Sequence, residues 1–147
     1  KNNFDFTYTN YLTFKANENF SKKHNELSII TSPKSFNFNT FIKNTSLCTS
    51  TMIIKKNLIG NIKFISTKIC EDYYFKCKIL KKIGNAYCLP KTLTKYRIRQ
   101  DSLQGNRLKN FYWIWHINKN YNRLNFLKNL ISILSISINS IKKYGFK

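Results

Sequence analysis

The chain has 147 residues, with 26 Lys plus Arg against 6 Asp plus Glu, and a formal net charge of +20. An apolar content of 42%, with 16% aromatic residues, is enough to build one hydrophobic core and argues against a disordered chain. The low counts of 4 Gly and 2 Pro exclude collagen-like and linker-like sequences. Lys, Asn and Ile together make up 61 residues, so we attribute part of the positive charge to composition and give it little weight as a functional signal.

The sequence opens at Lys1 and enters a strand-like run almost at once, without a charged and apolar leader. We therefore expect it to be the trailing part of a longer protein. The four cysteines include no CxxC pair: Cys48, Cys70, Cys77 and Cys88. This spacing predicts reduced, mostly buried thiols in a cytoplasmic protein rather than a zinc site or a disulfide framework.

Strand-forming residues dominate the first part of the chain. Residues 6–14 are rich in Thr, Tyr and Phe and predict a strand. The polar residues 15–35 predict an exposed excursion, such as a hairpin ending at Pro33, and residues 38–43 predict a short helix. The β-branched run 49–54 predicts a buried strand.

Helical spacing replaces this pattern over residues 71–83. Two carboxylates occupy the first turn, where the helix dipole favours them, and Gly84 follows the end. Residues 85–89 and 92–98 then predict two short extended segments joined around Pro90.

Beyond Gln104 the sequence predicts helices. The first has one apolar stripe with a second apolar edge: Leu108, Phe111, Tyr112 and Trp115, edged by Trp113 and Ile117. The second, over 124–143, has another stripe: Leu127, Leu130, Ile131, Leu134, Ile138 and Ile141. Lys128, Asn129 and several Ser interrupt this run, so it lacks the ~18 uninterrupted apolar residues of a spanning helix. It predicts an amphipathic helix instead.

An acidic pair and a basic segment after it carry a resemblance to a known family. The matching segments, in chain order, are TYTNY at 7–11, TSTMIIKK at 49–56, EDYYFKCKILKKIGNAYCLP at 71–90, TKYRIRQDSL at 94–103 and NRLKNFYWIWHINK at 106–119. Their order and spacing resemble the C-terminal half of family 2 glycosyltransferases, which are inverting enzymes with a nucleotide-binding GT-A α/β fold. The last segment resembles bacterial members that build surface polysaccharides.

The resemblance implies an α/β chain in which residues 1–103 form the acceptor-side half of a GT-A catalytic domain and residues 104–147 form a C-terminal helical extension. It implies transfer of a sugar from a nucleotide-diphosphate donor to a saccharide or lipid-linked acceptor, in polysaccharide or cell-envelope biosynthesis. It also implies a cytoplasmic location, with peripheral contact to the inner face of the cytoplasmic membrane through residues 124–147.

The resemblance assigns catalysis to Asp72 and Glu71. An inverting transfer needs a general base that removes the proton of the acceptor hydroxyl. The resemblance implies that Asp72 is this base and that Glu71 orients the acceptor or Asp72. Alternatively, both residues only stabilise the helix N-terminus, where a low pKa would weaken a base.

Substrate binding is assigned to Tyr96, Arg97, Arg99 and Ser102, which the resemblance places near the donor diphosphate. Guanidinium groups match phosphate oxygens in bidentate geometry. Many relatives carry His where Arg99 stands, so this chain favours charge neutralisation over metal ligation there. The alternative is a solvated basic loop.

The donor half of the family is not recognisable in this sequence. Its Asp residues are Asp5, Asp72 and Asp101, so it has no Asp-x-Asp motif for the divalent metal, Mg or Mn, that the full-length family uses. It also has no Gly-rich phosphate loop. We therefore expect a fragment that is inactive alone and contains no metal ligands.

A basic, non-catalytic module is the alternative to an enzyme. The charge and 23 aromatic residues suit nucleic acid, but the Lys residues are scattered and no nucleic-acid motif occurs, so we expect no nucleic-acid partner. A non-catalytic module that binds a membrane surface is the other alternative, because Lys128, Lys142, Lys143 and Lys147 accompany the last apolar stripe. We favour the simpler expectation that this stripe packs on the core of the domain.

Overall fold

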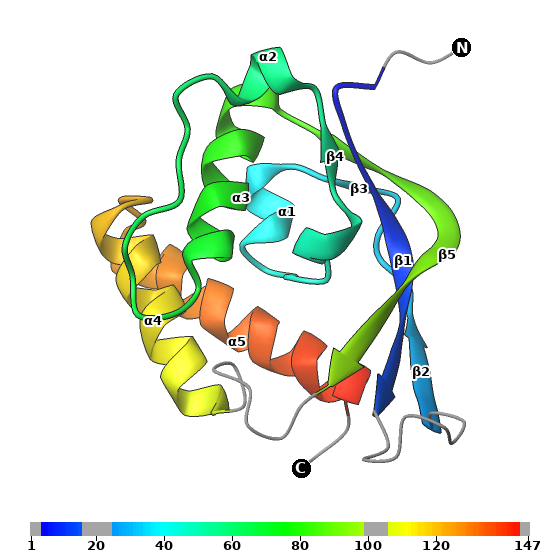
Figure 1. Cartoon of the computed structure of the whole chain (residues 1–147). Helices are drawn as coiled ribbons and strands as arrows, with labels where there is room; N and C mark the ends of the chain where they lie inside the picture. The colour runs from blue at the N-terminus through cyan, green and yellow to red at the C-terminus, as the bar shows by residue number, and fades with distance from the viewer. Residues whose placement is uncertain (1–3, 16–24, 99–105, 145–147) are drawn as a thin grey trace.

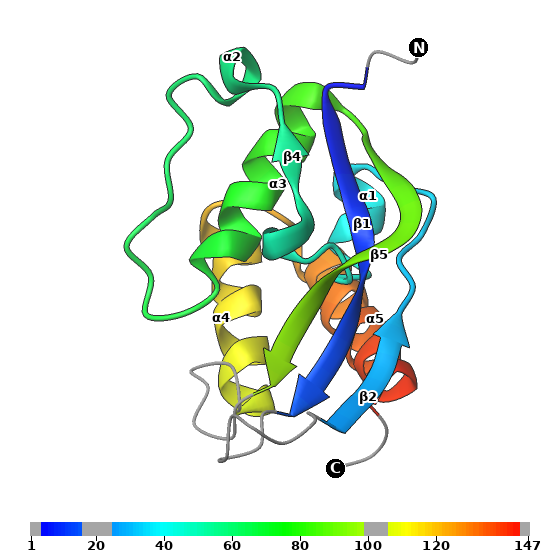
Figure 2. The same ribbon diagram turned by 45° about the vertical axis from the view of Figure 1, so that its right-hand side comes forward.

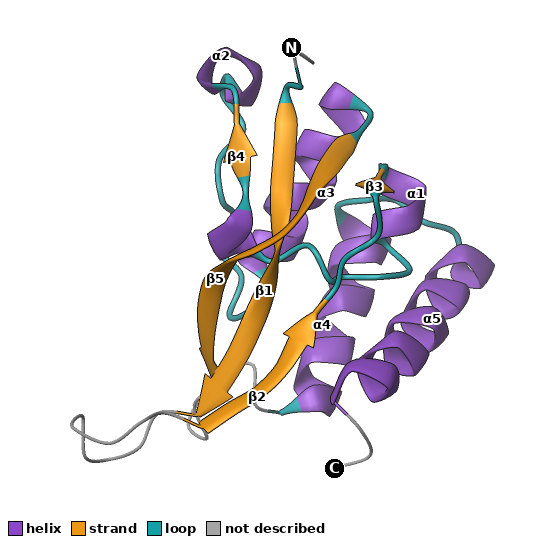
Figure 3. Cartoon of the chain, turned by 90° about the vertical axis from the view of Figure 1, so that its right-hand side faces the viewer, coloured by secondary structure: helices purple, strands orange, loops and turns teal. Residues whose placement is uncertain are grey.

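The computed structural model describes residues 4–15, 25–98 and 106–144, and it shows a mixed α/β fold (Figure 1). The strands are β1 (Phe6–Lys15), β2 (Asn25–Ile30), β3 (Ser35–Phe36), β4 (Ile53–Ile54) and β5 (Ala86–Ile98). The helices are α1 (Phe38–Phe41), the 3-10 turn η1 (Thr49–Thr51), α2 (Lys56–Ile59), α3 (Glu71–Ile83), α4 (Arg107–Asn120) and α5 (Phe126–Tyr144). The helices gather on one side of the sheet (Figure 3). The predicted α/β class is confirmed.

β1 is the central strand of the sheet. It runs parallel to β5 along most of its length, and antiparallel to β2 at its end and to β4 at its start. The predicted strand at 6–14 is thus confirmed, and β2 supplies the second arm of the predicted hairpin. The connection between the two arms, residues 16–24, lies outside the described residues.

β5 is one continuous strand, so the prediction of two segments joined at Pro90 is wrong. The pairing with β1 is nevertheless irregular there, because Leu89 faces Thr9 whereas Thr92 faces the next residue, Asn10. Proline has no N–H to give to a ladder, so an irregularity at this position allows the strand to continue.

The predicted buried strand at 49–54 is also wrong over most of its length. Thr49–Thr51 forms a 3-10 turn, and only Ile53–Ile54 pairs with β1. The Thr51 hydroxyl donates to the Cys48 carbonyl at 2.8 Å, a local bond that competes with strand pairing. Ile53 is 71% exposed, so this short strand lies at the surface.

The predicted helix at 71–83 is confirmed as α3, and the one at 38–43 is shorter, as α1. α3 packs its apolar side against α1 and the sheet, with Phe41 stacked on Tyr73 at a centroid distance of 5.4 Å. Ile114 and Ile117 of α4 and Ile136 of α5 join the same core. The predicted division between residues 103 and 104 lies outside the described residues and stays a prediction.

Buried polar side chains attach α4 and α5 to the fold, together with the apolar residues of these helices that reach the core. Asn118 is fully buried, accepts from the Tyr73 hydroxyl at 2.9 Å and donates to the Ser132 hydroxyl at 3.0 Å. Ser132 in turn donates to the Ile42 carbonyl. Asn122 donates to the Asn118 side-chain oxygen at 3.1 Å. We call Tyr73, Asn118, Asn122 and Ser132 the Asn118 network.

The predicted stripe on the last helix faces outward. The exposed residues of α5 include Leu127, Leu130, Ile131, Leu134 and Ile138. Leu108 and Tyr112 of α4 are likewise 80% and 63% exposed, whereas Phe111, Trp113 and Ile117 of the same helix pack in or against the core. No helix in the described part of the chain is long and apolar enough to cross a membrane.

Replacing Asn118 by Ala should lower the free energy of unfolding by about 2–4 kcal/mol, because it leaves the Tyr73 and Ser132 hydroxyls without their buried partner. Asn120→Ala, at an exposed position of the same helix, should change it by less than about 0.5 kcal/mol. Urea unfolding measures both. If the two variants lower the free energy of unfolding equally, the hydrogen bonds of the Asn118 network do not contribute specifically to stability.

Candidate functional site

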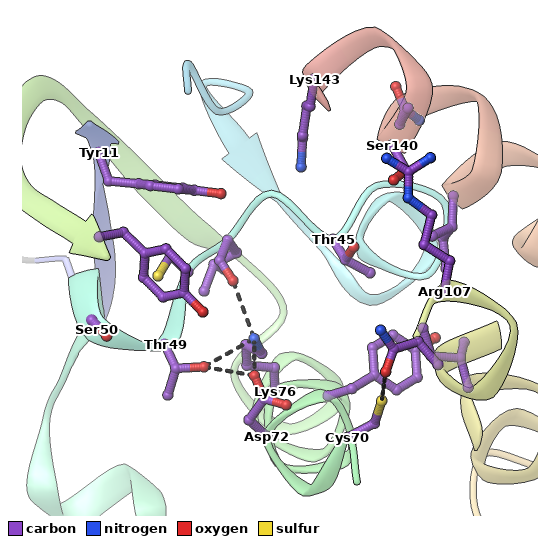
Figure 4. Close-up of a pocket in the computed structure, with 18 of the residues that line it drawn as sticks. Tyr11, Thr45, Thr49, Ser50, Cys70, Asp72, Lys76, Arg107, Ser140 and Lys143 are labelled. Carbon is purple, nitrogen blue, oxygen red and sulfur yellow. Dashed lines mark hydrogen bonds and ion pairs between the residues drawn. The ribbon is translucent and has the colours of Figure 1, made fainter. Parts of the chain in front are cut away.

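A cleft of about 1120 Å³ opens where four elements meet. Figure 2 shows the ends of β1 and β5 near the beginning of α4 and the end of α5. Residues of all four elements line the cleft, and the start of α3 and the loop at 45–50 complete it (Figure 4). The cleft is thus built from parts of the chain that are far apart in sequence.

The cleft brings together the four predicted site residues that the structure describes. Glu71 and Asp72 line it from the first turn of α3, and Tyr96 and Arg97 line it from the end of β5. Tyr96 makes an edge contact with the Tyr11 ring, at 5.9 Å between centroids. The two other predicted residues, Arg99 and Ser102, lie outside the described residues.

Asp72 is held by two hydrogen bonds. Its Oδ2 atom accepts from the Lys76 ammonium at 2.9 Å and from the Thr49 hydroxyl at 2.8 Å. Burial by itself raises the pKa of Asp72, but the Lys76 charge and these hydrogen bonds outweigh burial and hold the pKa below its usual value. Asp72 is therefore an anion over the whole physiological range.

Lys76 joins the start of α3 to the loop before η1. Its side chain is almost fully buried, and its ammonium also donates to the Leu47 carbonyl and the Thr49 hydroxyl, each at 3.1 Å. An ammonium has three protons, so these two acceptors and Asp72 satisfy it fully. The pair closes the floor of the cleft and leaves Lys76 little capacity for a ligand.

Glu71 is the more accessible carboxylate of the pair. Its side chain is exposed, and no hydrogen bond or ion pair joins it to another described residue. It lies one residue before Asp72 on the same cleft. The two carboxylates therefore differ: one is fixed and neutralised, and the other is free to meet a ligand.

The cysteines are free thiols, as predicted, with Cys70 and Cys77 buried and the other two partly buried. Cys70 lines the cleft directly before α3, in a left-handed conformation with φ of 66°. Burial, and then the charges of Asp72 and Glu71, raise the pKa of Cys70 to about 12. The Cys70 side chain therefore stays a thiol and is not a nucleophile at neutral pH.

Several cleft residues were not predicted. Lys76 lies four residues after Asp72, a spacing that favours an ion pair on a helix and that the sequence does contain. Thr49 has no such signal, because it is 23 residues from Asp72. Lys143 was expected beside a lipid surface, but it lines the cleft together with Arg107.

The divalent metal of the implied family does not fit the described residues. Among them, no group of three or more His, Cys, Asp or Glu lies close enough to hold a metal ion. Asp72 is already neutralised by Lys76, which leaves Glu71 as the single unpaired carboxylate that the described residues bring to the cleft.

Comparison with known proteins finds two relatives of low identity, both named as glycosyltransferases. The chain is 26% identical over 114 residues to TuaG of Bacillus subtilis, named for teichuronic acid biosynthesis, covering 78% of this chain and 45% of the relative. It is 26% identical over 147 residues to WfgD of Escherichia coli, named a UDP-Glc:alpha-D-GlcNAc-diphosphoundecaprenol beta-1,3-glucosyltransferase, covering 99% of this chain and 54% of the relative.

The chain thus spans about half the length of the curated relatives it matches. No family model matches it, and no solved structure matches it significantly. The similarity supports a relation to glycosyltransferases of cell-envelope polysaccharide biosynthesis, and the mixed α/β fold is consistent with a domain of such an enzyme.

The Asp72–Lys76 pair predicts a defined pH dependence of stability. Because the folded-state pKa of Asp72 lies below the ordinary value of 3.8, its contribution is complete above that value and is lost as the pH falls through the folded-state pKa. The difference in unfolding free energy between the wild type and Asp72→Asn should therefore shrink as the pH falls below about 4.

Urea unfolding at a series of pH values between neutral and strongly acidic measures this difference. Glu71→Gln is the matched control, because it removes a charge from the same helical turn that is paired with no other described residue. A difference for Asp72→Asn that is independent of pH would contradict the ion pair.

Proposed function

We propose that this chain is the acceptor-side part of an inverting family 2 glycosyltransferase of the GT-A fold, which transfers a sugar from a nucleotide-diphosphate donor to a saccharide or lipid-linked acceptor. The observation that carries the proposal is the cleft, where the carboxylates at the start of α3 meet the basic end of β5. The named activities of the two relatives support the class of reaction.

In the proposed reaction a carboxylate of α3 removes the proton of the acceptor hydroxyl while that oxygen attacks the anomeric carbon of the donor sugar. The nucleoside diphosphate leaves from the opposite face, which inverts the configuration. We assign the base to Asp72 and the orientation of the acceptor to Glu71. Asp72 is fixed by Thr49 and Lys76, which gives the positioning that such a step requires.

The ion pair with Lys76 opposes this assignment in one respect. An effective base has a pKa near the working pH, and Lys76 holds the pKa of Asp72 low. Glu71 has no partner among the described residues and faces the same cleft. Glu71 is therefore the competing base, and variants of the two carboxylates separate the assignments.

Arg97 is assigned to the donor diphosphate, together with Tyr96 beside it. The Arg97 side chain is exposed at the end of β5, so its fork of donors is accessible to a ligand in the cleft. Its charge would offset the negative charge that develops on the leaving diphosphate. Arg99 and Ser102 remain proposed members of the same segment.

Asp72→Asn should reduce turnover by roughly 10²- to 10⁴-fold and leave the donor KM nearly unchanged, because it removes the base and keeps the side-chain shape. The assay uses a protein that joins this chain to a donor-binding half. Arg97→Ala should instead raise the donor KM. If Glu71→Gln abolishes turnover while Asp72→Asn lowers only stability, the base is Glu71 and Asp72 is structural.

A peripheral membrane contact through residues 124–147 is the second part of the proposal, favoured by the apolar face that α5 leaves exposed. Leu127, Leu134 and Ile138 are each more than half exposed. The sequence after Asp101 contains eight Lys or Arg and no Asp or Glu, which suits the anionic inner leaflet of the cytoplasmic membrane. Burial of each such side chain in the bilayer interface contributes about 1.5–3 kcal/mol at most.

Replacing Leu134 and Ile138 together by Ser should reduce binding to vesicles with anionic lipid at least about tenfold, since two apolar anchors are lost. The matched control replaces Ile53 of β4 and Leu93 of β5 by Ser; these side chains are 71% and 64% exposed. Sedimentation with anionic and neutral vesicles measures the effect. A change in oligomeric state without a change in vesicle binding would instead identify the face as a contact between copies.

A further inference from the structure

The cleft contains more positive than negative charge. Among the described residues that line it, the cationic side chains are Lys15, Lys76, Arg97, Arg107 and Lys143, and the carboxylates are Glu71 and Asp72. Lys76 and Asp72 neutralise each other, so the remaining groups leave a net positive field. A concave site with low-dielectric walls strengthens such a field and favours an anionic ligand.

Lys143 extends into this cleft from the last turn of α5 (Figure 4). Burial first, and then the nearby Lys76 ammonium, lower the pKa of Lys143 to about 8. No hydrogen bond or ion pair joins the Lys143 ammonium to another described residue. A partly desolvated ammonium that faces a second cation is unfavourable unless an anion binds beside it.

Arg107 lies on the same wall of the cleft as Lys143. It is the first residue of α4, and Figure 4 shows its guanidinium directed toward Ser140 of α5. A guanidinium offers a fork of donors that fits phosphate oxygens, and an ammonium adds a compact charge. Ser140 of α5 also lines the cleft, and its hydroxyl offers a further donor.

We propose that Lys143 and Arg107, with the Ser140 hydroxyl, form a diphosphate-binding subsite on the α4–α5 wall of the cleft. Because the proposed reaction already places Arg97 of β5 at the donor diphosphate, this second subsite takes the diphosphate of a lipid-linked acceptor. That assignment rests on the proposed function. The helix that carries Lys143 also presents the exposed apolar face, so one element positions both the lipid surface and the phosphate group.

Inorganic pyrophosphate is the probe, titrated into this chain by calorimetry at physiological salt, where diffuse binding to a +20 protein is screened. Lys143→Gln and Arg107→Gln should each weaken binding about tenfold or more, since each removes a charge-assisted hydrogen bond. The matched controls are Lys128→Gln and Lys109→Gln, exposed on the same two helices, which should change binding less than about twofold.

Equal weakening by site and control variants, or no weakening by either, overturns the subsite. Lys143→Arg keeps the charge and should keep most of the binding. The melting temperature of Lys143→Gln should be unchanged or higher, because the variant removes a half-buried cation next to Lys76. Lost binding together with an intact fold therefore reports on the ligand.

Two further ligands identify the source of the diphosphate. Geranyl diphosphate, a short lipid diphosphate, should lose affinity on Lys143→Gln as pyrophosphate does, whereas UDP should not. If UDP depends on Lys143 and geranyl diphosphate does not, the subsite serves the donor and the acceptor assignment is wrong. None of these titrations needs turnover, so an inactive protein that binds pyrophosphate through Lys143 refutes the proposed transfer and not the subsite.

Discussion

The Asn118 network is the constraint on which the shape of the cleft depends. Asn118 connects the Tyr73 hydroxyl of α3 with Ser132 of α5, and Ser132 reaches the carbonyl of Ile42. Because these groups are buried, each would be costly without its partner, so the network fixes the position of α4 and α5 rather than merely adding stability. Without that position, the cleft would have the β1–β5 edge and the α3 floor but no helical wall.

The same arrangement explains why α5 presents its apolar side chains outward. Its inward positions include Asn129, whose side-chain nitrogen donates to the Trp115 carbonyl, and Ser132, whose hydroxyl accepts from Asn118. A polar contact of this kind needs few apolar residues, and Ile136 with the partly buried Ile133 supplies apolar contact of α5 with the core. The Leu and Ile residues that α5 leaves exposed lie outside this core, which makes a separate role for them reasonable.

Local signals in the sequence predicted the elements that depend on local physics. The sequence predicts α3 with the bounds that the structure has, because Glu71 and Asp72 favour its start and Gly84 stops it. The run at 49–54 failed because the Thr51 hydroxyl stabilises a turn that no strand pattern reveals. The outward face of α5 was not predicted, because periodicity identifies an apolar face but not its partner. Here a hydrogen bond between Ser132 and Ile42, 90 residues apart, accompanies the inward turn of the opposite face.

Part of the candidate site was predictable from the sequence, but the contacts that set the charge of its residues were not. The resemblance indicated the carboxylates of α3 and the basic end of β5, and the fold brings them to one cleft. The resemblance could not indicate that the Asp72 carboxylate is already paired, because this pairing depends on Lys76 and Thr49. Lys76 cancels the charge of Asp72, whereas Lys143 has no carboxylate opposite it among the described residues. Two lysines in one cleft thus have opposite consequences: one holds the fold together, and the other leaves a positive charge that a ligand can neutralise.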